Sequence, residues 1–233
     1  MAKIKNSKKT TTTRPGGVVN ASRRRSNLMP LIDSLIQDGW LKAPKIIDAF
    51  IEIKRADFIP EDMRNLAELN EALPIGYNQT ISQPLTVAFM LEQLQPESGN
   101  NILDIGSGSG WTTALLAQIV GPKGKITAIE IVPELKEFGQ KNVAKYNFIK
   151  KERAKFICAD GSKGYKKEAP FDRILASAAV QGKVPRAWKE QLKIGGRIVT
   201  PVGSSIWVIT KKSKKEFKEI EHPGFVFVPL IEK

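Results

Sequence analysis

The sequence predicts an α/β protein with a doubly wound, mostly parallel seven-stranded sheet and an N-terminal helical cap. After Pro96, short apolar runs alternate with helical stretches, and this alternation is typical of parallel strands covered on both faces. Before Pro96, apolar residues recur at helical spacing instead. The chain has 233 residues, 41% of them hydrophobic and 26% charged, a balance typical of a soluble protein with a full core.

The cap is predicted from its apolar spacing and its helix breakers. Apolar residues spaced three and four apart predict a first helix from Leu28 to Gly39. A second helix is expected from Pro44, and Pro60 ends it. Residues 73–84 are rich in turn formers and polar side chains, so we expect a functional loop that is neither helix nor strand. A third helix is expected over residues 85–95.

The sheet is predicted from seven apolar runs. Five of them are expected to be parallel strands: residues 101–105, 125–131, 154–159, 173–176 and 197–201. Helices are expected between them, at residues 112–120, 133–147 and 185–192. Residues 205–211 and 225–230 are expected to form an antiparallel hairpin around a lysine-rich turn at one edge of the sheet. We expect that turn, residues 211–215, to be solvated.

The first 32 residues carry eight basic side chains and no acidic one, which is more than half of the formal net charge of +13. The segment is also poor in apolar residues, so residues 1–26 are predicted to be a disordered basic tail. Such a tail is compatible with RNA, anionic lipid or an acidic partner, and equally with a solvated arm that has no specific partner. It lacks the amphipathic character of a transit peptide.

Cys158 is the only cysteine, so the sequence predicts neither a disulfide framework nor a cysteine-rich zinc site. We expect no metal site and a reducing cytoplasmic location. No apolar run approaches the roughly 18 residues that cross a bilayer, and no signal peptide is visible. Cys158 itself is expected to fill the core, and His222 to be a surface residue in a C-terminal loop. Trp111 is expected to pack between helix and sheet or against the edge of a ligand.

A glycine-rich loop follows the first predicted strand of the sheet. Residues 103–110 read LDIGSGSG and run directly into a helix. In an open α/β sheet, ligands bind at the carboxyl ends of the strands, and glycines let the backbone approach them closely. The helix N-terminus also offers unpaired N–H groups to a negative group. The spacing is neither the dinucleotide fingerprint nor a phosphate-binding P-loop.

Acidic residues lie at the ends of three consecutive predicted strands. Glu130 is placed to accept hydrogen bonds from both hydroxyls of a ribose, and Asp160, followed by Gly161, to accept one from an adenine amino group. Asp104 precedes the glycine loop, and bracing that loop is its alternative role. Three acids around one glycine-rich loop predict a nucleoside pocket.

Residues 100–200 with these motifs resemble the class I S-adenosylmethionine-dependent methyltransferases, which have a Rossmann-like fold. The resemblance implies that S-adenosylmethionine is the cofactor and that Asp104 acts around its methionine part. It implies the following cofactor-binding set: Asp104, Gly106, Ser107, Gly108, Gly110, Glu130, Ile131, Asp160 and Gly161.

Residues 72–84, ALPIGYNQTISQP, resemble the signature of the protein-L-isoaspartate O-methyltransferases, and further similar segments extend over nearly the whole chain after residue 28. These include residues 58–60, 129–135, 160–162, 169–174 and 192–197. The resemblance implies a single methyltransferase domain over residues 27–233, with the helical cap and acceptor loop in 27–95 and the cofactor-binding sheet in 96–233. It assigns Ser82 and Thr80 to the catalytic site and Gln79 and Ile81 to substrate binding.

The activity implied by this resemblance is methylation of the free α-carboxylate of L-isoaspartyl residues in damaged proteins, which begins repair through a succinimide. The acceptor is already an anion at pH 7, so the enzyme has to position it and exclude water. Hydroxyls at Thr80 and Ser82 can orient a carboxylate without neutralising it. Ser82 has an alternative role as a helix N-cap. The sequence departs from the family pattern at Asn70, Ala72 and Asn78, which bears on substrate preference or rate.

Two other functions stay open. A nucleic-acid methyltransferase would use the basic tail, but residues 177–180 read SAAV instead of the Asn/Asp-Pro-Pro-aromatic motif of amino-group methylation. A non-catalytic adaptor that binds S-adenosylmethionine would keep the fold and recruit a partner. We expect isoaspartyl peptides and proteins as partners, nucleic acid through the tail alone, no membrane, and a monomer.

Overall fold

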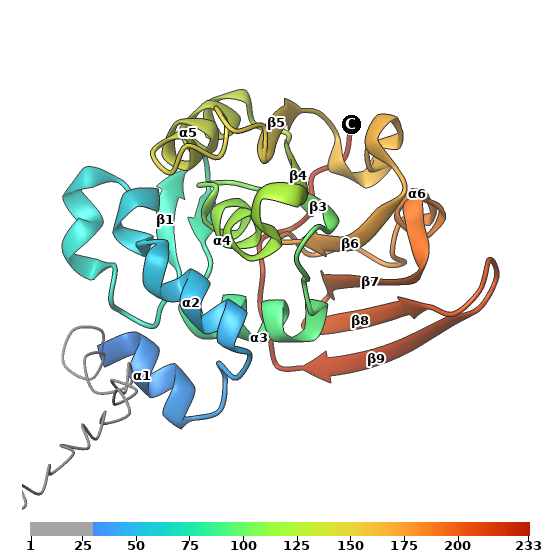
Figure 1. Ribbon diagram of the computed structural model, residues 1–233, viewed down its shortest axis with the longest axis horizontal. Helices are drawn as coiled ribbons and strands as arrows, with labels where there is room; N and C mark the ends of the chain where they lie inside the picture. The colour runs from blue at the N-terminus through green and yellow to red at the C-terminus, as the bar shows by residue number, and fades with distance from the viewer. Residues whose placement is uncertain (1–29) are drawn as a thin grey trace, which may run out of the picture.

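Seven strands form the main sheet in the computed structural model, which describes residues 30–233 (Figure 1). Their bounds are β3 (Asn101–Ile105), β4 (Lys125–Glu130), β5 (Ala154–Cys158), β6 (Phe171–Ala176), β7 (Leu192–Val202), β8 (Ser205–Lys211) and β9 (Phe217–Pro223). The spatial order is β5-β4-β3-β6-β7-β8-β9. The mostly parallel seven-stranded sheet predicted from the sequence is therefore confirmed. The tail predicted over residues 1–26 lies outside the described residues.

The order of the strands creates a binding crevice at the centre of the sheet. From β3 the chain winds outward through β4 and β5, then returns to β6 on the other side of β3, and these strands are all parallel. β7 continues in parallel, and β8 and β9 complete the edge in antiparallel pairs. Such a reversal of direction opens a crevice at the carboxyl ends of the strands, where α/β proteins bind ligands.

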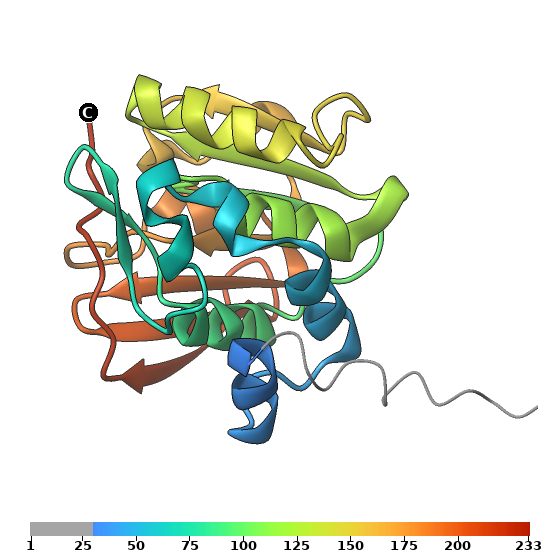
Figure 2. The same ribbon diagram turned by 90° about the vertical axis from the view of Figure 1, so that its left-hand side faces the viewer.

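Helices cover one face of the sheet, and a smaller layer covers the other. The main helices are α1 (Pro30–Gln37), α2 (Pro44–Glu52), α3 (Pro84–Leu94), α4 (Trp111–Val120), α5 (Pro133–Ala144) and α6 (Arg186–Gln191). Helices α4 and α5 lie side by side on β3, β4 and β5 (Figures 1 and 2). Ile102 of β3 joins the core beneath these helices, and its neighbour Leu103 joins the core of the opposite face, beside Trp188 of α6. This alternation explains why the strands read as continuous apolar runs.

The cap and the sheet share one hydrophobic core. Ile46 and Phe50 of α2 belong to the same buried cluster as Leu115 of α4 and Ile126 of β4. Pro44 begins α2 at a position where its missing N–H costs nothing. The first helix is described from Pro30, so the predicted start at Leu28 is not described. Short 3₁₀ turns, η2 (Arg55–Phe58) and η3 (Glu61–Leu66), connect α2 to the segment that follows.

The loop expected over residues 73–84 is in part a hairpin, so that expectation was wrong. β1 (Leu73–Gly76) and β2 (Gln79–Ile81) pair antiparallel. The turn between them places Tyr77 and Asn78 at φ of 55° and 56°, the left-handed region that a tight two-residue hairpin requires. Asn tolerates this conformation better than most residues, which is why the chain can turn here without glycine.

The C-terminal hairpin has a different second strand from the one expected. β9 covers residues 217–223, whereas residues 225–230 run extended across the carboxyl ends of the strands and form an isolated bridge, Ala179 with Pro229, beyond the end of β6. His222 therefore lies in β9 with its ring edge on Phe89, rather than in a surface loop. Lys211 is also buried and donates to the carbonyls of Lys189 and Leu192, so the solvated turn begins after it.

Cys158 is exposed, contrary to the prediction that it fills the core. It is the last residue of β5, and β5 is the outermost strand on its side of the sheet. An edge strand has a neighbour on one side alone, so its last residue can face solvent. None of the helices in residues 30–233 is long and apolar enough to span a bilayer.

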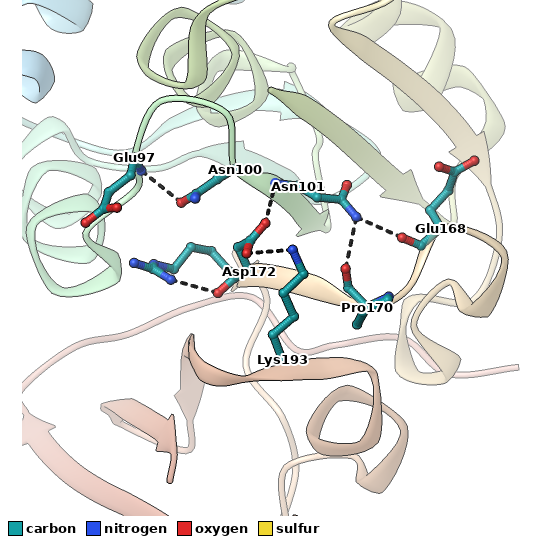
Figure 3. Close-up of polar contacts among 8 residues, drawn as sticks. Glu97, Asn100, Asn101, Glu168, Pro170, Asp172 and Lys193 are labelled. Carbon is teal, nitrogen blue, oxygen red and sulfur yellow. Dashed lines mark hydrogen bonds and ion pairs between the residues drawn. The ribbon is translucent and has the colours of Figure 1, made fainter. Parts of the chain in front are cut away.

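A polar network fixes the amino ends of β3 and β6, at the edge of the sheet opposite the crevice (Figure 3). The Asp172 carboxylate accepts from the Asn101 backbone N–H at 2.8 Å and from Lys193 Nζ at 2.8 Å. The Asn101 amide donates to the carbonyls of Glu168 and Pro170. These contacts set the register of the two strands that flank the crevice.

Candidate active site

A cleft opens at the carboxyl ends of β3, β4 and β6, and we call it the central cleft. Its empty volume, with the open solvent at its mouth included, is about 760 Å³. It is lined by the glycine loop, by the ends of β4 and β5, by the acceptor loop at residues 79–82 and by the C-terminal residues 228–231. Of the sequence-predicted residues, Gln79, Thr80, Ile81, Ser82, Gly106, Ser107, Gly108, Glu130, Ile131 and Gly161 line it. Asp104, Gly110 and Asp160 lie behind this lining.

The glycine loop needs glycine for reasons of packing and conformation. Gly106, Gly108 and Gly110 all have positive φ. At Gly110, a Cβ would lie 2.7 Å from the Gly139 carbonyl oxygen, so any side chain would push α5 away. The loop therefore packs tightly against α5 and turns directly into the N-terminus of α4.

Glu130, at the end of β4, is buried and aimed at the glycine loop. Its Oε2 accepts from the Gly108 N–H at 2.9 Å, and its Oε1 accepts from the N–H groups of Ile131 and Val132 at 2.8 and 3.0 Å. Three backbone donors fix the carboxylate in the lining of the cleft. Each carboxylate oxygen has more than one acceptor site, so capacity remains for the hydroxyls of a ligand.

Asp104 has no exposed surface and lies beneath the glycine loop. Its Oδ2 accepts from the hydroxyls of Thr112 and Thr113 at 3.1 and 2.6 Å. Burial raises the pKa of Asp104 to about 6, against the two threonine hydrogen bonds, which lower it. Asp104 thus ties the end of β3 to the first turn of α4, which is the bracing role left open by the sequence.

Asp160 is occupied by its own loop and by the C-terminal segment. Its Oδ1 accepts from the Ser162 N–H and hydroxyl at 2.9 and 2.7 Å. Its Oδ2 accepts from the Lys233 N–H at 3.1 Å and pairs with Lys163 Nζ at 3.2 Å. Partial burial raises the pKa of Asp160, but these hydrogen bonds outweigh it and lower the pKa to about 2. The neighbouring Gly161 lines the cleft.

Thr80 and Ser82 lie where the central cleft meets a second hollow, which we call the aromatic groove. The groove is lined by Trp40, Phe89, His222 and the C-terminal residues Phe225 and Phe227, among others. Thr80, Ser82, Ser177 and Val228 line both hollows. Within residues 30–233, the hydroxyls of Thr80 and Ser82 have no hydrogen-bond partner. Two hydroxyl donors therefore face the junction of the two hollows.

Helix α3 is not capped by Ser82. Gln83 occupies the N-cap position without a side-chain cap hydrogen bond. The Asn70 side chain accepts from the Leu85 N–H at 2.9 Å instead, and Gln83 Nε2 donates to the Asn70 carbonyl. Asn70, one of the departures from the family pattern, thus holds the acceptor loop against the start of the helix.

Trp111, singled out in the sequence, is buried in the core and also lines the central cleft. Among residues 30–233 its indole Nε1 has no acceptor, and the buried Ser107 hydroxyl has no partner either. Buried donors without partners at a cleft indicate that a bound ligand completes them. Arg55 was missed by the sequence reasoning, because no local motif marks a residue whose partners are distant in the sequence.

These groups fit S-adenosylmethionine. Glu130 can accept from ribose hydroxyls, the N-terminus of α4 and the Trp111 N–H can face a carboxylate, and Ile105, Ile129 and Leu230 offer apolar walls to an adenine. Within residues 30–233, no lysine or arginine side chain lines the central cleft, as suits a ligand that itself carries a sulfonium charge.

Comparison with known proteins agrees with this geometry. The profile of the family described as protein-L-isoaspartate(D-aspartate) O-methyltransferase matches residues 26–233. A protein-L-isoaspartate O-methyltransferase of Methanopyrus kandleri is 39% identical over 213 residues, covering 90% of this chain and 92% of its own. One from Thermococcus sibiricus is 40% identical over 209 residues, covering 87% and 92%.

Solved structures share the fold. A putative protein-L-isoaspartate O-methyltransferase of Plasmodium falciparum, determined with S-adenosyl-L-homocysteine, superposes with a TM-score of 0.79 at 21% identity, over 87% of this chain and 97% of that one. Another structure with the name protein-L-isoaspartate O-methyltransferase has a TM-score of 0.76 at 26% identity, over 85% and 64%.

The fold and the central cleft define an S-adenosylmethionine-dependent methyltransferase. This assignment is based on three features: the glycine loop, the glutamate at the end of β4, and the crevice where the strand order reverses. Within the class, the chain belongs to the protein-L-isoaspartate(D-aspartate) O-methyltransferase family.

Proposed function

We propose that this chain transfers the methyl group of S-adenosylmethionine to the free α-carboxylate of L-isoaspartyl residues in damaged proteins. The observation that carries the proposal is the position of Thr80 and Ser82 in the lining shared by the central cleft and the aromatic groove. A cofactor in the cleft and a peptide in the groove would meet at these hydroxyls. The high identity to relatives with this name over most of the chain supports the same acceptor.

The cofactor is held by the residues of the central cleft. Glu130 binds the ribose hydroxyls, Ile131 and Gly161 enclose the adenine, and Gly106, Ser107 and Gly108 bring backbone against the methionine part. Gly110 and Asp104 act from behind the loop, through its packing and its threonine braces. Asp160 acts through the shape of its loop, which places Gly161 beside the adenine, and through the C-terminal segment that it anchors.

When bound, S-adenosylmethionine supplies a methyl group on a sulfonium, so the O–CH₃ bond forms as the S–CH₃ bond breaks and no proton moves. Thr80 and Ser82 donate hydrogen bonds to the acceptor carboxylate and orient one oxygen toward the methyl group. Gln79 and Ile81 bind the acceptor peptide beside them. Ile105 and Val228 help to exclude water from the junction. Because the acceptor is already an anion, the chain needs no general base for this step.

The acceptor is an extended segment of peptide in the aromatic groove. Val226 is 91% exposed, and the run from Phe225 to Val228 lies along the groove opposite the acceptor loop. A peptide between these two segments can pair its backbone with either of them, as extended ligands do at strand edges. This arrangement favours flexible, locally unfolded acceptors. A cytoplasmic location and a monomeric state belong to the same proposal, and fractionation and light scattering check them.

A methyl-transfer assay with three acceptors separates this function from its alternatives. Full-length protein and labelled S-adenosylmethionine are incubated with an isoaspartyl peptide, with the same peptide containing normal aspartate, and with total RNA. We expect base-labile label on the isoaspartyl peptide, because a methyl ester hydrolyses in base. Stable label on RNA would establish the nucleic-acid alternative instead. Binding of S-adenosylhomocysteine without label on any acceptor would favour the adaptor.

A further inference from the structure

The acceptor loop is built around a buried cation that no catalytic motif contains. Arg55, in the turn η2 after helix α2, is 6% exposed, and its side chain enters the space enclosed by residues 67–82. Burial lowers the pKa of Arg55 to about 10, and Glu68 opposes this, so the group stays cationic at neutral pH. Arg55 forms no ion pair within residues 30–233, and a buried charge without one is costly, which indicates that its hydrogen bonds serve a specific purpose.

The guanidinium joins both ends of the acceptor loop. Its Nη1 donates to the carbonyls of Ala67 and Leu69 at 3.1 and 3.0 Å. Its Nη2 donates to the carbonyl of Glu71 at 2.6 Å, just before β1, and to the carbonyl of Ser82 at 3.3 Å, just after β2. One planar group therefore bridges the start and the end of the hairpin that carries Thr80.

The same group rests against the cofactor side of the site. The Arg55 Cζ lies 5.5 Å from the centre of the Trp111 ring, and Trp111 is the first residue of α4 and lines the central cleft. Phe50 also packs against Trp111, with the two ring centres 5.5 Å apart in an edge-to-face arrangement. Arginine suits this position because its fork reaches several acceptors at once while its face stacks on an aromatic ring.

We propose that Arg55 is a positioning residue for methyl transfer: it fixes the carbonyl of Ser82, and with it the hydroxyls of Ser82 and Thr80, relative to Trp111 at the cofactor end of the site. The proposal rests on the function proposed above and adds a residue that lies outside the segments on which the family resemblance was based. Arg55 itself lines neither the central cleft nor the aromatic groove, so it contacts neither the cofactor nor the peptide in this proposal. Its effect is on the geometry in which carboxylate and methyl group meet, where small displacements are costly.

Arg55→Lys tests this role, with Arg153→Lys as the matched control. Lysine keeps the charge but has one nitrogen, which cannot replace both Nη1, on the carbonyls of Ala67 and Leu69, and Nη2, on those of Glu71 and Ser82. Arg153 also lies over an aromatic ring, with Cζ 5.0 Å from the centre of Phe148, and donates to a single carbonyl, that of Ala117 at 3.3 Å. It belongs to the loop before β5 and does not contact the acceptor loop. The same substitution is thus made in a similar setting away from the junction.

Three measurements are made on full-length wild type and both variants: steady-state methylation of an isoaspartyl peptide, calorimetric binding of S-adenosylhomocysteine, and amide hydrogen exchange with that product bound. In Arg55→Lys we expect kcat/KM for the peptide to fall about 10- to 100-fold, as expected for a displaced acceptor site. We expect product affinity to stay within about 2-fold and exchange to accelerate in residues 67–83 alone. Arg153→Lys should match wild type in peptide kinetics and in these amides.

The outcomes separate this proposal from the proposed function. If the wild-type protein does not methylate the isoaspartyl peptide, the proposed function is wrong. Amide hydrogen exchange in residues 67–83 then still shows whether Arg55 orders the acceptor loop. Unchanged peptide kinetics and exchange in Arg55→Lys would overturn the proposal. A loss of product affinity as large as the loss in kcat/KM would also overturn it, because Arg55 would then support the whole site and not the acceptor loop in particular. Arg55→Gln serves as a second variant, and failure of both to fold with product bound, while Arg153→Lys folds, would assign Arg55 to stability alone.

Discussion

Two buried carboxylates of the cleft, Asp104 and Glu130, have different surroundings and therefore different roles. Glu130 faces three backbone N–H donors at the cleft wall. Asp104 is enclosed beneath the loop, where two threonine hydroxyls supply its only hydrogen bonds among the described residues. Hydroxyls compensate the loss of water less fully than a ring of backbone donors, so the ionised form of Asp104 is disfavoured.

Ionisation of Asp104 should lower the free energy of unfolding as the pH rises. The folded carboxyl, with a pKa of about 6, holds its proton more tightly than an ordinary aspartate at 3.8, so the folded state binds more protons between these values. The free energy of unfolding should therefore decrease by roughly 3 kcal/mol through this window, relative to Asp104→Asn. Asparagine keeps an oxygen for the threonine hydroxyls but does not titrate. Urea unfolding of both proteins from pH 4 to 7 measures the difference, and a flat difference would contradict this account.

Ser82→Ala should reduce methylation and leave cofactor binding unchanged. In the proposed function, the Ser82 hydroxyl donates to the acceptor anion at the junction, and such a hydrogen bond contributes about 1.5–3 kcal/mol, or roughly 10- to 100-fold in rate. We expect this loss in kcat/KM for the isoaspartyl peptide, with the Kd of S-adenosylhomocysteine within about 2-fold. Ser213→Ala, in the exposed turn before β9, is the control. Equal turnover in both variants would remove Ser82 from the site.

Single residues of the site were predictable where a local motif marks them. The glycine loop, Glu130 and Thr80 with Ser82 all stand in short patterns whose chemistry can be argued from the sequence. Arg55 stands in none, because its partners lie 12 to 56 positions away. Cys158 was placed wrongly because its strand reads as apolar, although it lies at the edge of the sheet.

At the level of elements, the parallel strands were predictable because strands buried on both faces read as apolar runs, and their ends agree closely for β3, β4 and β5. The acceptor hairpin was not, because Pro74 and Gly76 interrupt the pattern and the strands are short. Residues 225–230 have a strand-like apolar sequence, but this segment lines the two hollows and is not a strand of the main sheet. Tertiary packing decided these cases, as it often does for short elements.

Asp172→Ala should destabilise the fold without changing the site. The substitution leaves the Asn101 N–H without an acceptor at the amino end of β3, which costs about 1–3 kcal/mol. Glu168→Ala is a matched control from the same network, because its backbone carbonyl still accepts from Asn101 and its carboxylate pairs with Lys155, which is largely exposed. We expect that control within about 0.5 kcal/mol of wild type. Thermal unfolding checks both, and equal stability of the two variants would contradict the bracing role.

At the scale of the whole molecule, the cap and the sheet build the site together. Arg55 of η2 and the start of α3 hold the acceptor loop, and the sheet holds the glycine loop, with a common core between them. The basic charge is concentrated in the first 32 residues, apart from this machinery in the sequence. The site therefore does not depend on the tail for any contact described within residues 30–233.

Deletion of residues 1–26 should leave peptide methylation within about 2-fold of wild type. A peptide enzyme positions its acceptor through the groove, whereas a nucleic-acid enzyme would lose salt-dependent affinity with its basic residues. Methylation of the isoaspartyl peptide is measured at two salt concentrations with and without the tail. A large loss of turnover on deletion, reversed by low salt, would contradict a peptide acceptor and favour nucleic acid.

The central claim is that the junction of the two hollows accepts the isoaspartyl carboxylate. The measurement that tests it most directly compares kcat/KM for two peptides that differ in one linkage, isoaspartyl or normal aspartyl. The account predicts a preference of at least about 100-fold for the isoaspartyl peptide, because the α-carboxylate alone reaches Thr80 and Ser82 in register with the methyl group. Equal rates for both peptides, or label on neither while S-adenosylhomocysteine binds, would contradict it.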